Sequence, residues 1–251
     1  MSKHETFILT PLTTVLEEMI TATSGINDGI ETYPLWDYVL QATFTKMTGF
    51  QEQKMKCIDW ELATNGYDYR ITFVDEVKNR GTYSNYESKN SVYNALISEI
   101  ARYLGRDIRD VITDLQNEII IKPKDAVKLL LNNTKVIHCR QREYDEFLNC
   151  DNEFLHQFFV LPDPKAKKAK MLGENLEKRY KDEIYRNRNR IAHNTLSYQQ
   201  NLPELDGLKN ENDLSRNYFF WFTVLVSIDE LFIGLYKKYS DCLKNYSYFE
   251  E

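Results

Sequence analysis

Apolar residues recur at helical spacing along most of this 251-residue chain, and glycine or proline marks the breaks. One long pattern predicts a helix over 34–63, with core positions at Leu35, Val39, Met47, Phe50, Ile58 and Leu62. Another predicts a helix over 212–243, with a core of Phe219, Phe222, Val226, Leu231, Leu235 and Tyr239. Two long amphipathic helices are therefore expected, one in each half of the chain.

Shorter patterns predict the remaining elements. Further helices are expected over 7–23, 91–104, 106–116, 123–133, 143–159 and 172–193. Residues 65–90 are polar and rich in tyrosine, and Arg70–Asp75 resembles a short strand, so we expect a loop or a small β-hairpin there. Nine glycines and six prolines are few for an all-β protein of this length. The sequence therefore predicts an all-α fold.

The length allows one large helical domain or a core domain with an added lobe. A hydrophobic content of 42%, with 13% aromatic residues, is enough to bury a substantial core. We expect a single helical domain over 1–251, with 65–160 as an additional helical lobe and 165–245 carrying the last two long helices. Residues 195–210 should form the loop between those two helices.

The apolar run over 218–236 is the one membrane candidate, but it contains Asp229 and Glu230. Each carboxylate would cost about 2.5–3.5 kcal/mol near the centre of a bilayer, which favours a core or dimer helix. The chain begins without a signal-peptide pattern, and its four cysteines are far apart with no metal-ligand spacing. We therefore expect a cytoplasmic protein with reduced thiols, no membrane contact and no bound metal.

Positive charge is concentrated in one segment. The whole chain has a net charge of -6, yet residues 165–193 hold ten Lys and Arg against four Asp and Glu, about +6. The remainder therefore carries about -12. Ion pairs along a solvated helix face, such as Glu177 with Lys181, explain part of this segment. They explain Arg186, Arg188 and Arg190 less well, which makes a site for an anion the alternative.

The three arginines lead to a histidine in the sequence Arg186-Asn-Arg-Asn-Arg-Ile-Ala-His193. Arginine fits phosphate oxygens, and imidazole takes and returns protons near neutral pH, so the pattern indicates chemistry on a phosphodiester. The spacing Arg188, Asn189, three residues, His193 resembles the signature of the HEPN superfamily, in which Arg and His are separated by four to six residues.

An ideal helix of 3.6 residues per turn predicts how these side chains are directed. The inward face carries Tyr180, Ile184 and Ile191. Asn189, His193 and Arg186 lie on the roughly opposite face, whereas Arg188 lies about 140° from His193, at the margin of the buried face. The family motif favours Arg188 as the catalytic arginine and helix geometry favours Arg186. A bend near the motif, or a dimer cleft wide enough for both faces, would reconcile Arg188 with the site.

The resemblance implies an antiparallel HEPN-like bundle that forms a homodimer, with two motif helices facing one cleft. It implies a metal-independent endoribonuclease without cofactors, in which the RNA 2′-hydroxyl attacks the phosphate. His193 would act as acid and base, Arg188 would stabilise the phosphate, and Asn189 would orient either group. Arg186, Arg190, Lys168 and Lys170 would bind the substrate backbone. Such proteins resemble toxins or anti-phage effectors, and an antitoxin or other regulatory partner would then be expected.

Two other functions fit the same residues. The chain could be a non-catalytic HEPN module that binds RNA, nucleotide or a protein partner, or a structural dimer whose arginines pair with Asp182 and Glu183. Carboxylates of the 34–63 helix (Glu52, Asp59 and Glu61) could approach the cleft and orient His193, although exposed carboxylates usually form only the solvated face of a helix. The sequence contains no Walker loop, dinucleotide fingerprint or His-Glu-x-x-His motif.

Overall fold

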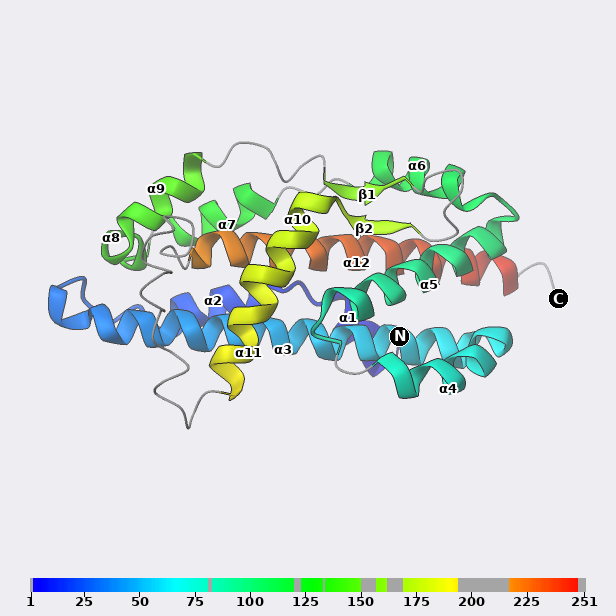
Figure 1. Ribbon diagram of the computed structural model, residues 1–251, viewed down its shortest axis with the longest axis horizontal. Helices are drawn as coiled ribbons and strands as arrows, with labels where there is room; N and C mark the ends of the chain where they lie inside the picture. The colour runs from blue at the N-terminus through cyan, green and yellow to red at the C-terminus, as the bar shows by residue number, and fades with distance from the viewer. Residues whose placement is uncertain are drawn as a thin grey trace.

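The protein is mostly helical, with one pair of short strands (Figure 1). The computed structural model describes residues 2–80, 83–119, 123–132, 134–149, 157–161, 169–193 and 217–247. The all-α prediction is therefore confirmed for the described chain. The predicted loop over 195–210 and the start of the 212–243 helix lie outside the described residues.

The N-terminal segment forms two helices, α1 (Lys3–Leu9) and α2 (Thr13–Ala22), so the prediction of one helix over 7–23 was wrong. Thr10 adopts an extended conformation with φ -70° and ψ 121°. The residue before a proline is biased away from the helical region, and Pro11 follows Thr10 directly. The resulting break leaves the backbone N–H of Leu12 free to donate a hydrogen bond to the buried carboxylate of Asp229.

The predicted helix over 34–63 is present as α3 (Tyr33–Asn65), which follows the short 3-10 turn η1 (Ile30–Thr32). Pro34 occupies the first turn, where its missing N–H costs no hydrogen bond. Met47, Ile58 and Leu62 are fully buried, as the periodicity predicts. Leu35 is 45% exposed, so this expected core position was wrong, because it lies in the first turn of the helix at the end of the molecule.

Residues 67–80 form a helix, α4 (Tyr67–Arg80), and not the expected loop or hairpin. The chain leaves α3 through an extended Gly66 and turns back into a helix that contacts α3. Tyr69 stacks on Phe73 four residues later, with ring centroids 5.8 Å apart, and its phenol donates to Asp59 of α3 at 2.8 Å. Contacts at a spacing of four residues stabilise a helix here.

The next two helices are α5 (Tyr86–Leu104) and α6 (Ile108–Glu118), and the predicted break at Gly105 is confirmed. Gly105 adopts a left-handed conformation with φ 62°, which glycine reaches without a steric penalty. The helix α5 begins five residues earlier than predicted because Asn85 caps it by accepting a hydrogen bond from the Ser88 N–H at 2.7 Å. It contacts both α3 and the last helix of the chain.

The middle of the chain continues with α7 (Pro123–Leu131), α8 (Val136–Cys139) and α9 (Gln141–Asn149). The expected helix over 143–159 was therefore wrong in its second part. Its last residues form strand β1 (Phe158–Val160), which pairs antiparallel with β2 (Lys170–Leu172) in the register Phe158 with Leu172. Aromatic and β-branched residues favour this half-buried strand. The strand pair thus lies at 158–172, not at 65–90.

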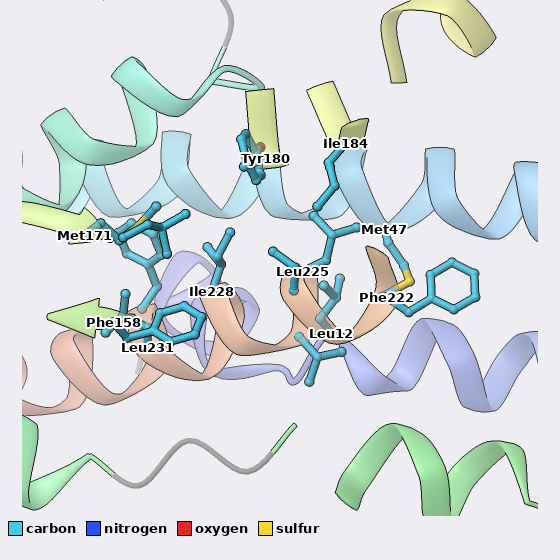
Figure 2. Packing of buried hydrophobic residues seen from close by; sticks show 14 of the residues in the cluster. Leu12, Met47, Phe158, Met171, Tyr180, Ile184, Phe222, Leu225, Ile228 and Leu231 are labelled. Carbon is cyan, nitrogen blue, oxygen red and sulfur yellow. The ribbon is translucent and has the colours of Figure 1, made fainter. Parts of the chain in front are cut away.

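The motif segment forms one continuous helix built from α10 (Glu174–Arg179), the π-helical segment η2 (Tyr180–Tyr185) and α11 (Arg186–His193). In Figure 1 this helix crosses the long helices α3 and α12 (Tyr218–Ser247). Figure 2 shows Tyr180 and Ile184 above Leu225 and Ile228 of α12, within the main hydrophobic core.

The helix α12 is the central core helix. Its predicted core positions are all at most 1% exposed: Phe219, Phe222, Val226, Leu231, Leu235 and Tyr239. The span Tyr218–Tyr246 is long and apolar enough to cross a membrane, with a hydropathy of 1.6, but 83% of its apolar window is buried inside the protein. That burial is typical of the core helix of a soluble protein, as the two carboxylates in the sequence indicate.

Candidate functional site

The motif residues occupy the eight-residue helix α11, directly after the π-helical segment. The inward face is as predicted: Tyr180 and Ile184 are buried, and Ile191 is partly buried against the core. A π-helical segment has hydrogen bonds from residue i to i+5 and more residues per turn than an α-helix. This segment changes the helical register between Tyr180 and α11, yet Ile191 still packs on the inward side, as the ideal projection predicts.

Arg188 is directed toward α3, and its side chain is 19% exposed. Its Nη2 donates a hydrogen bond to Oε2 of Glu52 at 3.2 Å, and its Nη1 donates to Oδ1 of Asn189 at 3.1 Å. Glu52 is 13% exposed and also pairs with Lys56 at 3.1 Å. The ion pair holds the guanidinium in one place between two helices. A guanidinium has five N–H donors, and these two contacts use two of them.

Glu52 thus lies beside the motif helix, as one alternative from the sequence predicts. That alternative expected Glu52 to orient His193, whereas the contact that the structure describes is with Arg188. The side chain of His193 lies outside the described part of the structure; its backbone ends α11. The other two carboxylates are engaged elsewhere, since Asp59 accepts from Tyr83 at 2.7 Å and Glu61 accepts from Ser2 at 2.8 Å.

Arg186 and Arg190 are exposed on α11, as expected for residues that face solvent. Neither side chain makes an ion pair or a hydrogen bond with any other described residue. Asn189 is only partly exposed because it bonds Arg188. The expected pairing of the motif arginines with Asp182 and Glu183 is not found among the described residues, in which Glu183 pairs with Arg179 at 3.0 Å.

Of the two expected substrate lysines, the structure describes only Lys170, which is separated from the arginines. Lys168 lies outside the described residues. Lys170 lies on β2 before the helix begins, on the order of 25 Å from Arg188 by helical rise. It approaches Glu177 at 3.6 Å, and Glu177 also pairs with Lys181 at 2.8 Å, as the sequence predicts. The glutamates of α10 therefore partly neutralise the lysines at this end.

A buried lysine that the sequence analysis did not single out lies near the motif. Lys89 on α5 is 1% exposed. The pKa of Lys89 is lowered to about 7, mainly by burial; Glu52 and Asp229 oppose this change, and the positive charge of Arg188 adds to it. A sequence signal existed, because Lys89 lies four residues before the buried Tyr93 and so on the core face of α5.

A second buried lysine, Lys54, is 0% exposed and pairs with Asp229 of α12. Lys54 also donates to the carbonyl of Thr10 at 2.7 Å, and the other oxygen of Asp229 accepts from the Leu12 N–H at 2.8 Å. Burial lowers the pKa of Lys54 and raises the pKa of Asp229, while the hydrogen bond between them opposes both changes. This pair fixes α3 and α12 to the break between α1 and α2.

The described residues contain no cluster of three or more His, Cys, Asp or Glu side chains that could hold a metal ion. The described cysteines Cys57, Cys139 and Cys242 are free thiols, and burial raises the pKa of each. A raised thiol pKa disfavours the thiolate that metals and electrophiles require. The charged groups around Arg188 therefore form the candidate functional site among the described residues.

Comparison with protein-family models, with curated proteins and with solved structures finds no match for this chain. The relation to the HEPN superfamily stays a prediction from Arg188, Asn189 and His193.

Proposed function

We propose that the protein is a metal-independent endoribonuclease whose site is built on α11. The observation that carries the proposal is the geometry of Arg188, a partly buried arginine held by Glu52 and Asn189 five residues before His193 on the same helix. Fixed donors stabilise developing negative charge better than mobile ones because they need no reorganisation during the reaction. Arg186 and Arg190 supply exposed positive charge beside it.

In the proposed reaction, His193 removes the proton of the RNA 2′-hydroxyl, whose oxygen attacks the adjacent phosphorus. The bond to the 5′ oxygen breaks, and that oxygen takes a proton from a protonated imidazole. The products are a 2′,3′-cyclic phosphate and a 5′-hydroxyl. The acid and the base are the two His193 copies of a homodimer, and Arg188 donates to the phosphorane oxygens.

The proposal is tested by RNA cleavage in the presence of a chelator. We expect His193→Ala to reduce the rate about 10²–10⁴-fold and Arg188→Ala about 10²–10³-fold. Matched controls are His138→Ala on α8 and Arg142→Ala, whose side chain is 87% exposed on α9. Both should cleave at the wild-type rate. Undiminished cleavage by His193→Ala, at equal far-UV circular dichroism, refutes the mechanism.

A comparison of two variants tests whether Arg186 or Arg188 is the catalytic arginine. Arg188 contacts α3 and Arg186 contacts solvent, so their alanine variants separate a phosphate-stabilising role from backbone steering. We expect Arg186→Ala to raise KM, because exposed arginines bind backbone phosphates electrostatically. This increase in KM should become smaller as the salt concentration rises. A larger fall in kcat for Arg186→Ala than for Arg188→Ala assigns the catalytic role to Arg186.

A second function is favoured by the same ion pair. Because Glu52 already neutralises much of the Arg188 charge, α11 also suits a non-catalytic module that binds RNA or nucleotide. Binding of labelled RNA by wild type, with no cleavage product and reduced affinity in Arg186→Ala, supports this function over the nuclease.

The cellular role follows from the nuclease proposal. We propose a cytoplasmic toxin or anti-phage effector that acts as a homodimer and is restrained by an antitoxin or other regulator. Free thiols fit a reducing compartment. Growth arrest on expression of wild type, absent with His193→Ala, supports this role, and arrest by both proteins contradicts it.

A further inference from the structure

A row of side chains follows the surface of α3 away from the candidate site. Glu52 pairs with Arg188 at 3.2 Å. Lys56 and Trp60 follow Glu52 at intervals of four residues, and residues four apart are neighbours on a helix surface. The Nζ of Lys56 lies 3.1 Å from Oε1 of Glu52, and the Lys56 side chain is 43% exposed. We call this row, from Glu52 to the end of α3, the α3 ridge. Figure 1 shows α11 crossing α3 at one end of the ridge and α4 beside the other end.

Trp60 is the unusual member of the α3 ridge, because 60% of it is exposed to solvent. The other two tryptophans of the chain, Trp36 and Trp221, are each 1% exposed in the core. The indole of Trp60 contacts the imidazole of His4 on α1, with ring centroids 6.0 Å apart and an angle of 83° between the planes. An exposed aromatic ring that is supported by a neighbour offers a flat surface on which a nucleobase can stack.

A cation lies at the far end of the α3 ridge. Thr64 follows Trp60 by four residues and donates from Oγ1 to the Trp60 carbonyl at 2.8 Å. The exposed guanidinium of Arg70 on α4 donates to the carbonyls of Ala63 at 2.7 Å and of Thr64 at 2.9 Å. These contacts cap the end of α3, but their acceptors are neutral. Among the described residues Arg70 pairs with no carboxylate, so its positive charge is available at the surface.

We propose that the α3 ridge binds single-stranded RNA, with a nucleobase stacked on Trp60 and the phosphates on either side of it bound by Lys56 and Arg70. The inference rests on the proposed function, because it takes the substrate of the Arg188 site as its ligand. The ridge is about 18 Å long by helical rise, which is enough for a few nucleotides. Aromatic rings between cations are the arrangement with which proteins bind single strands without reading their sequence.

A protein partner is the alternative occupant of this surface. The helix α4, which contacts α3, exposes Tyr67, Ile71 and Val74 at helical spacing, and exposed apolar side chains also mark protein interfaces. The cations on both sides of Trp60 favour RNA, because charged residues are depleted at the centre of a protein interface.

The fluorescence of Trp60 tests the stacking directly, since the other two tryptophans are buried. A single-stranded 2′-O-methyl RNA oligonucleotide, which lacks the attacking hydroxyl, is titrated into the full chain. We expect it to quench the tryptophan emission of wild type and to leave that of Trp60→Phe nearly unchanged. Equal quenching in both proteins, or binding to wild type without quenching, overturns the stacking.

The affinity for the same oligonucleotide, labelled with a fluorophore, is measured by anisotropy. We expect Trp60→Ala to weaken binding about 5- to 100-fold, and Trp60→Phe to weaken it less, because phenylalanine also stacks. Tyr38→Ala is the matched control, since Tyr38 is 70% exposed near the other end of α3, and it should bind like wild type. A duplex of the same sequence should bind less tightly, because its bases are already paired and stacked. Equal losses in Tyr38→Ala and Trp60→Ala overturn the proposal.

The salt dependence of binding tests the phosphate contacts. Arg70→Gln should weaken binding and reduce the slope of log affinity against log salt concentration by about 0.7, the value for one phosphate of a single strand. Arg142→Gln is the matched control, because the Arg142 side chain is 87% exposed on α9, and it should change neither quantity. An unchanged slope in Arg70→Gln overturns the phosphate contact at this end of the α3 ridge.

The outcomes separate this inference from the proposed nuclease. Binding that depends on Trp60, without any cleavage of ordinary RNA, refutes the nuclease and supports the α3 ridge as an RNA surface. Cleavage by wild type with an unchanged KM in Trp60→Ala overturns the RNA surface and leaves the nuclease. Failure of the oligonucleotide to bind, together with a changed sedimentation coefficient in Trp60→Ala, assigns the surface to a protein partner and overturns the inference.

Discussion

Replacing the buried Lys89 by methionine should change how the stability of the protein depends on pH. The native pKa of about 7 is lowered from the ordinary value of 10.5. Between these two values the unfolded chain binds one proton more than the native protein, so the free energy of unfolding rises with pH. One pKa unit corresponds to about 1.4 kcal/mol, so wild type should gain about 2–3 kcal/mol from pH 7 to pH 9 through this one group.

Lys89→Met has no such titration, and methionine fills a similar volume with an apolar side chain. We expect the variant to match or exceed wild type at pH 7, because its native state buries no charge. Its advantage should then shrink by about 2–3 kcal/mol at pH 9. Urea unfolding at pH 7, 8 and 9, followed by far-UV circular dichroism, measures both curves, and equal m-values show that the same surface unfolds.

The control is Lys46→Met on α3, since the Lys46 side chain is 59% exposed beside Glu18. Its stability should stay parallel to that of wild type across the pH range. A constant difference between wild type and Lys89→Met, within about 0.5 kcal/mol, would refute the buried neutral lysine. Such a constant difference would show instead that Glu52 and Asp229 keep Lys89 charged between pH 7 and pH 9.

Four further substitutions test the fold and the packing of the motif helix. Asp229→Asn leaves the buried Lys54 without its counter-ion and should cost about 3–5 kcal/mol in urea unfolding, and a loss below about 1 kcal/mol would contradict a buried ion pair. Gly105→Ala places a side chain at φ 62°, which should cost about 1–2 kcal/mol and lower the thermal midpoint by a few degrees; an unchanged midpoint speaks against the left-handed turn. Ile184→Ala should cost about 2–5 kcal/mol and Arg186→Ala less than about 0.5 kcal/mol, and equal costs would mean that α11 and η2 are oriented differently.

The long helices could be predicted because their periodic patterns extend over many turns. Met47, Ile58 and Leu62 repeat the same face of α3, and the pattern allows no other regular structure at that length. Short segments gave less information. Over the six residues Arg70–Asp75, alternation and helical periodicity are hard to distinguish, and the contact of Tyr69 with Phe73 that favours the helix appears only in three dimensions.

The strand pair could not be placed from local patterns. Phe158–Val160 is too short to show a period, and its partner Lys170–Leu172 lies beyond a segment that contains two prolines. Two short strands become stable only when they pair and pack on other elements, and β2 contacts α5. The sequence therefore predicted a loop or small hairpin at 65–90, whereas the strand pair is formed by Phe158–Val160 and Lys170–Leu172.

The candidate site was predicted in part. The inward direction of Tyr180 and Ile184 follows from the sequence, because these residues are four apart on one face. The position of Arg188 at the margin of the buried face also agrees with its partial burial, but its partner does not follow from the sequence. Its partner Glu52 is 136 residues away in the chain, on a face of α3 that would be solvated if α11 did not cross it. A tertiary crossing thus turned an ordinary surface carboxylate into a partner of the motif.

The positive charge of the motif segment divides between the two ends of one helix. At the start, Lys170, Arg179 and Lys181 all contact glutamates, which supports the interpretation of a solvated face with ion pairs. At the end, Arg186 and Arg190 have no such partner among the described residues. Paired charges of opposite sign largely cancel in the field around the protein, whereas unpaired guanidinium groups attract anions within about a Debye length. Under the proposed function, RNA would therefore approach α11, the end of the helix at which Arg188 pairs with Glu52.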